Sequence, residues 1–197
     1  MRATRLAALL GLVLGLAACV PVVSLNPLYT DKDIVFDPAL VGTWSDKDGE
    51  GFLTFSKRND ASYDVLMTDD DRKEARFVGH LVKLGARRFL DLASDRAALD
   101  DHLEDVSMTT LTAPGHFFLT VKQIEPTLQM GFLDDEWMEK LIKSNAAAMR
   151  GLAARQVTES GDRAVLIGST EDLQRFVVAN VDKPGAFNST SELRRQP

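Results

Sequence analysis

Apolar and polar residues alternate along much of the chain, and this spacing predicts β-strands. In residues 61–67 every second residue is apolar, as in a strand with one buried face. Four more strands are predicted at residues 40–45, 52–57, 75–84 and 88–92. The breaks between them are rich in Asp, Asn and Gly, which favour tight turns, so the strands should form an antiparallel meander.

The second half of the sequence adds further strands and two helices. Strand patterns occur at residues 116–124, 127–133, 156–158 and 164–168. The apolar spacing is helical at 134–144, where Asp134 is a suitable N-cap, and again at 170–180 after Ser169. The predicted fold class is therefore mainly β with two helices. An open sheet would leave the backbone N–H and C=O groups of its edge strands unpaired, so we expect the meander to curl into a barrel or half-barrel.

The motif Gly42-Thr43-Trp44 opens the first of these strands. It resembles the Gly-x-Trp opening of lipocalins, small barrels in which this tryptophan packs across the barrel floor. The resemblance implies a lipocalin-like barrel, and the helix near 170–180 suits a barrel with a helix packed outside it.

The first 18 residues have the pattern of a secretory signal. Two arginines precede an uncharged apolar run at 6–18, which ends in small residues. This run is shorter than the roughly 20 residues that a membrane-spanning helix needs. The sequence thus predicts a leader that is removed.

The end of the leader, Leu16-Ala17-Ala18-Cys19, resembles the lipobox of bacterial lipoproteins. That resemblance implies cleavage between Ala18 and Cys19, with a diacylglyceryl group on the sulfur and an acyl chain on the new amino terminus. Several chains are needed because one alone binds a membrane only marginally. Val20 replaces the Asp that commonly marks inner-membrane retention, so we expect the outer membrane, facing the periplasm. Alternatively, Cys19 is an incidental small residue after an ordinary signal.

The mature chain divides into three predicted parts. Residues 19–39 contain three prolines and form a tether or an extended arm lying on the domain. Residues 40–181 form a single β-rich domain, and the polar residues 182–197 form a disordered tail. Residues 26–30 and 37–44 also resemble the start of uncharacterised bacterial lipoproteins, a resemblance that implies no activity.

The charge and the cysteine content of the chain limit the partners that it can bind. The formal net charge is −6, and removing the two arginines of the leader makes the mature chain more acidic still. This balance argues against nucleic-acid binding and against adhesion to an anionic bilayer by charge. The single cysteine excludes an intramolecular disulfide. If the protein lies on a membrane, lipid must hold it there.

Patterns typical of catalysis or metal binding are not evident. His80, His102 and His116 lack the neighbours of a zinc motif, and residues 46–50 fit an Asp-Gly turn better than a calcium loop. No nucleophile elbow or phosphate-binding loop occurs. We therefore predict no metal, no cofactor beyond the covalent lipid, and no enzymatic activity, with a hydrolase as the least favoured alternative.

Several aromatic residues could line a ligand cavity or simply fill the core. They are Trp44, Tyr63, Phe77, Phe89 and Phe118. In small barrels most inward aromatics belong to the core. The sequence favours a membrane-anchored, non-catalytic lipoprotein that binds a small apolar ligand; the alternative is an interaction or accessory subunit of a cell-envelope complex.

Overall fold

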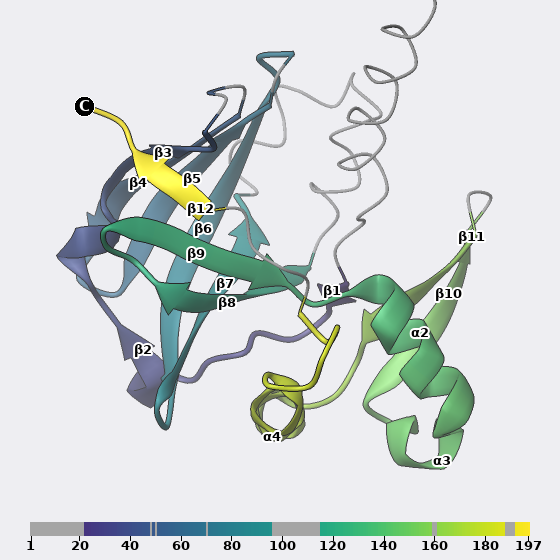
Figure 1. Ribbon diagram of the computed structural model, residues 1–197. Helices are drawn as coiled ribbons and strands as arrows, with labels where there is room; N and C mark the ends of the chain where they lie inside the picture. The colour runs from purple at the N-terminus through teal and green to yellow at the C-terminus, as the bar shows by residue number, and fades with distance from the viewer. Residues whose placement is uncertain are drawn as a thin grey trace, which may run out of the picture.

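The computed structural model describes residues 22–47, 49, 51–69, 71–95, 115–158, 161–187 and 192–197. Their main feature is a closed, eight-stranded antiparallel barrel (Figure 1). Its strands are β3 (Gly42–Ser45), β4 (Phe52–Asn59), β5 (Ser62–Thr68), β6 (Glu74–Leu84), β7 (Arg87–Ser94), β8 (His116–Gln123), β9 (Thr127–Phe132) and β12 (Glu192–Arg195). The meander runs from β3 to β9, and β12 closes the ring between β3 and β9. The mainly β, lipocalin-like barrel predicted from the sequence is confirmed.

Alternation of buried and exposed residues places one face of each strand inside the barrel. In β6, Phe77 and Leu81 point inward and are buried. Gly79 lies between them, where an added Cβ would come within 2.8 Å of Val65 Cγ2. The strand therefore needs glycine there because the interior is closely packed.

A smaller sheet extends from the barrel at the start of β8. There β1 (Val23–Ser24) pairs antiparallel with β8 and parallel with β11 (Gly161–Leu166), which pairs with β10 (Ala153–Thr158). Two helices, α2 (Asp135–Ser144) and α3 (Ala146–Met149), lie beside this sheet in Figure 1. The sequence predicted the β10–β11 hairpin but not β1.

Both predicted helices are present, at α2 and at α4 (Thr170–Asn180). The Asp134 carboxylate accepts the Trp137 N–H at 2.8 Å, and the Ser169 hydroxyl accepts the Asp172 N–H at 3.2 Å. These N-caps fix the helix starts expected from the sequence. Within the part of the chain that is described, no helix is both long and apolar enough to cross a membrane.

The segment before the barrel lies on the domain along its described length. We call residues 25–35 the strap. It includes the 3-10 helix η1 (Asp31–Asp33) and β2 (Ile34–Val35), which pairs with β6. A second 3-10 helix, η2 (Pro38–Leu40), then leads into β3. Of the two predicted alternatives, a tether or an arm lying on the domain, the described residues form the arm.

The C-terminal residues correct a prediction. We expected disorder from residue 182 onward, but residues 182–187 follow α4 with Phe187 bridged to Leu133, and β12 completes the barrel. The polar composition of this segment was misleading because β12 is held by strands on both sides, with only Leu193 packed against the interior apolar residues.

The buried apolar residues form two clusters. One fills the barrel, and the other lies outside it, where the barrel wall meets α2, α4 and the small sheet. Leu28 of the strap belongs to the outer cluster and is fully buried. The outer cluster therefore fixes the strap against the barrel wall.

Candidate functional site

The floor of the barrel is closed around Trp44. Its indole N–H donates to the Leu40 carbonyl at 2.9 Å, and its ring is fully buried. The Arg195 guanidinium lies 4.3 Å from the ring centre and donates to the carbonyls of Val41, at 2.6 Å, and Ala39. Such a stacked cation is attracted by the ring face. Trp44 thus packs across the floor, as the Gly-x-Trp resemblance implied.

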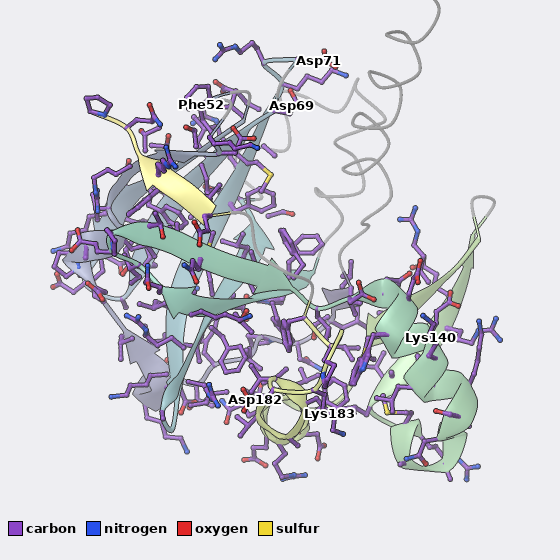
Figure 2. The ribbon with its side chains drawn as sticks, viewed as in Figure 1. Phe52, Asp69, Asp71, Lys140, Asp182 and Lys183 are labelled. Carbon is purple, nitrogen blue, oxygen red and sulfur yellow. The ribbon has the colours of Figure 1, made fainter. Side chains whose placement is uncertain are left out.

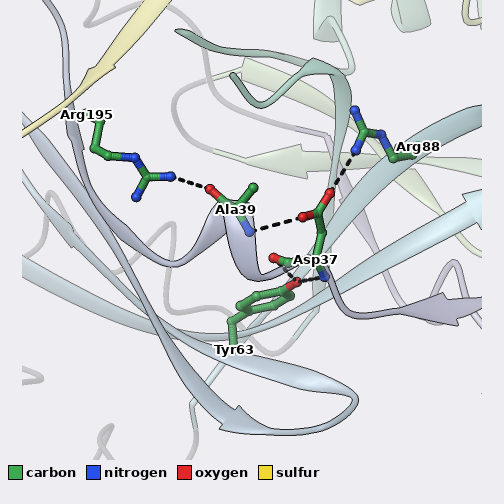
Figure 3. A network of polar contacts seen from close by, with 5 residues as sticks. All are labelled: Asp37, Ala39, Tyr63, Arg88 and Arg195. Atoms are coloured by element: carbon green, nitrogen blue, oxygen red, sulfur yellow. Dashed lines mark hydrogen bonds and ion pairs between the residues drawn. The ribbon is translucent and has the colours of Figure 1, made fainter. Parts of the chain in front are cut away.

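A second polar network supports the same floor (Figure 3). The Tyr63 hydroxyl accepts the Asp37 N–H at 2.7 Å and donates to the Asp37 carbonyl at 3.1 Å. The Asp37 carboxylate accepts the Ala39 N–H at 3.0 Å and pairs with Arg88 at 3.2 Å. Burial raises the pKa of Tyr63, so its hydroxyl stays protonated and able to donate.

The five predicted aromatic residues are all buried, but they do not share one compartment. Trp44, Tyr63 and Phe77 belong to the barrel interior. Phe89 and Phe118 belong to the outer cluster. In β8 it is Phe117 that points inward, and its neighbour Phe118 must then point outward. Only the first three can contribute to a site inside the barrel.

The floor half of the interior is tightly filled. Leu40, Leu81, Leu90 and Leu128 are fully buried, so no space large enough for water adjoins them. Some interior side chains are partly exposed at the end of the barrel opposite the floor, where the turns between β3 and β4 and between β5 and β6 lie. Figure 2 labels Phe52, Asp69 and Asp71 at this end.

We call the end of the barrel opposite the floor the open end. Among the interior side chains here, Leu53 and Met130 are each 8% exposed, and Met67 and Phe132 are half-buried. Leu53 and Met67 are register partners on β4 and β5. The interior side chains at this end are thus less completely covered than Leu40, Leu81, Leu90 and Leu128.

A buried polar cluster lies on the outside of the barrel, under the strap. Asp91 of β7 is 0% exposed, and its carboxylate accepts the Leu28 N–H at 2.7 Å. The other carboxylate oxygen lies 2.7 Å from His116 Nδ1. His80, the register partner of Asp91 on β6, packs against the Tyr29 ring with centroids 4.2 Å apart and the ring planes tilted by 31°. Asp91 thus joins the strap to β7 and β8, and His80 adds a contact between the strap and β6.

Asp91 and His116 form a carboxylate–imidazole pair like the one that orients the base of a hydrolytic site. A carboxylate that positions an imidazole is common in nucleophilic catalysis. Ser24 faces His116 across the β1–β8 pair, but it is fully buried and its hydroxyl donates to the Asn26 carbonyl at 2.7 Å. Among the residues described, no group of three or more His, Cys, Asp and Glu could hold a metal ion. The geometry therefore fits anchoring of the strap better than catalysis.

Sequence reasoning did not single out Asp91. The available signal was its position between Leu90 and Leu92, on the strand face shared with Phe89. An acid at such a position must find partners when the face is covered. For His80 and His116 we predicted no metal-ligand role, but also no place in a buried polar cluster, and His102 lies outside the described residues.

His80 makes the fold sensitive to acid. Burial lowers the pKa of His80; the nearby Asp91 opposes this effect, whereas His116 and Arg58 add to it. Its Nδ1 atom is buried without a hydrogen-bond partner. The folded protein therefore disfavours the protonated ring.

We expect the free energy of unfolding to fall as the pH drops through about 6.5, because the unfolded chain then binds a proton that the folded chain resists. His80→Gln should show a smaller loss. Urea unfolding of both proteins at about pH 7.5 and about pH 5.5 measures the difference. Equal losses in the two proteins would refute this role for His80.

Comparisons of the chain with protein-family models, with curated proteins and with solved structures found no match. Ala18 and Cys19, the predicted cleavage and lipidation positions, lie outside the described residues.

Proposed function

We propose that the chain is a non-catalytic bacterial lipoprotein, cleaved before Cys19 and held on a membrane by lipid on that residue. The observation that carries the proposal is the lipobox itself: the only cysteine of the chain follows Leu16-Ala17-Ala18 and a signal-like leader. Val20 favours the outer membrane, facing the periplasm. The acidic mature chain supports a lipid anchor rather than adhesion by charge.

The barrel in this proposal binds a small apolar ligand at its open end. Leu53, Met67, Met130 and Phe132 supply apolar surface that is only partly covered. The closed floor leaves the open end as the side from which a ligand enters. A barrel tethered to a bilayer would hold such a molecule close to the lipid phase.

Replacing Cys19 tests the anchor. In Cys19→Ala we expect the protein to leave the membrane fraction or to accumulate with its leader uncleaved, because no sulfur can receive the diacylglyceryl group. The measurement is immunoblotting of salt-washed membranes and soluble fractions from cells that express the full chain. A mutant that stays membrane-bound with its leader removed would contradict the anchor.

Met67→Glu tests the ligand site. We expect it to weaken binding of the apolar fluorophore N-phenyl-1-naphthylamine by about tenfold or more, because the ligand would have to desolvate a carboxylate. Val178→Glu is the matched control, since Val178 is an exposed apolar residue on α4. Fluorescence titration of the purified full chain gives both affinities. Unchanged binding in Met67→Glu would exclude the open end.

The filled floor half favours one alternative, an accessory subunit of a cell-envelope complex. In that case the wild-type protein would bind neither the fluorophore nor any copurifying ligand in native mass spectrometry.

A further inference from the structure

Two large apolar side chains are exposed just beyond the ends of β1 and β11. Leu25 is 59% exposed and Ile167 is 38% exposed. Ser24 pairs in parallel with Leu166, and the Leu25 N–H donates to the Leu166 carbonyl at 2.9 Å. Leu25 and Ile167 therefore each directly follow the last register pair of the two strands.

Ser24 and Leu166 are buried on one face of β1 and β11, so the preceding register pair, Val23 and Val165, lies on the other face. Val23 and Val165 are half-buried, and Val23 packs against the apolar residues of the barrel interior. We call Leu25, Ile167, Val23 and Val165 the sheet patch.

The chain outside the described residues determines what can cover the sheet patch. Only three peptide units separate Cys19 from Val22, a reach of about 11 Å at full extension. Lipid attached to Cys19 would therefore hold the sheet patch within a short distance of the bilayer. The mature chain is acidic, so its charge does not attract it to anionic headgroups. Contact with the bilayer would therefore come from apolar side chains.

The sheet patch also lies at the open end of the barrel. β1 pairs with Phe117 and His116 at the beginning of β8, and this end of β8 lies opposite the floor. A bilayer that covers the sheet patch would thus lie beside the entrance for an apolar ligand.

From this geometry we propose that the sheet patch is a membrane-seating surface, through which Leu25 and Ile167 enter the interfacial region of the bilayer that holds the lipid anchor. The proposal rests on the proposed lipidation of Cys19. It adds a defined orientation, with the open end toward the lipid and the floor away from it.

The single native cysteine makes this orientation measurable. Because lipidation consumes its thiol, Leu25→Cys and Ile167→Cys each introduce one unique labelling site. Asp60→Cys is the control, since Asp60 is 97% exposed in the turn between β4 and β5 at the floor. The lipidated full chains are labelled with nitrobenzoxadiazole and reconstituted into vesicles of phosphatidylethanolamine and phosphatidylglycerol that contain acyl-chain nitroxides.

We expect the labels at positions 25 and 167 to show blue-shifted emission and loss of intensity by nitroxide quenching, and the label at position 60 to show neither. If all three labels behave alike while the protein floats with the vesicles, the seating surface is refuted and the anchor stands. If the wild-type chain does not float with the vesicles, the anchor itself is refuted. Thermal melting of each variant verifies that the exposed substitutions leave the fold intact.

Discussion

Replacing Trp44 with alanine should lower the free energy of unfolding by about 3–5 kcal/mol. The side chain is fully buried in the barrel core, and its removal leaves a cavity that the closed strands cannot collapse around. It also removes the donor to the Leu40 carbonyl and the ring on which Arg195 stacks. Urea unfolding followed by far-UV circular dichroism measures the change, and a loss below about 1 kcal/mol would contradict the floor arrangement.

Trp44→Phe separates packing from the hydrogen bond. A phenyl ring keeps much of the buried apolar surface but cannot donate to Leu40, so we expect a smaller loss than in Trp44→Ala. The lost hydrogen bond alone accounts for about 1 kcal/mol. If the free energy of unfolding fell by the same amount in both variants, the packing of the ring would contribute nothing to stability.

Replacing Asp91 with alanine should lower the free energy of unfolding by about 2–4 kcal/mol, since hydrogen bonds to charged groups contribute about 1.5–3 kcal/mol each and buried donors left unpaired are costly. The variant deprives the Leu28 N–H and His116 of their common partner, a carboxylate that is 0% exposed. We also expect faster hydrogen exchange at the Leu28 amide, because that amide loses its acceptor.

Asp64→Ala is the control for Asp91→Ala. Asp64 pairs with Arg58 at 2.8 Å, but both side chains are largely exposed, and such pairs contribute about 0–1 kcal/mol. Equal destabilisation by the two substitutions would show that the buried cluster does not anchor the strap.

The sequence was sufficient to predict the strands and helices in which apolar residues recur at a regular spacing. β4 to β9 and the helices α2 and α4 lie close to their predicted ranges, because each is long enough for a 2.0 or 3.6 period to be evident. The two-residue strands β1 and β2 and the four-residue β12 carry no such signal. They are held by pairing with residues far away in the chain, which no local pattern encodes.

The residues of the barrel floor and interior were likewise predictable only where a local pattern marks them. Trp44 was identified by a local motif, but its partner Arg195 lies near the other end of the chain. The period of two shows that alternate residues share a face without saying which face is inside. Phe118 was consequently named as a cavity or core residue of the barrel; it is a core residue, but of the outer cluster, and Phe117 is the inward side chain.

The mass of the N-terminal peptide of the protein isolated from cell membranes tests the lipid anchor directly. We expect a peptide that begins at Cys19 and carries a diacylglyceryl thioether together with an amide-linked acyl chain. A free thiol at Cys19, or a membrane form that retains residues 1–18, would contradict it.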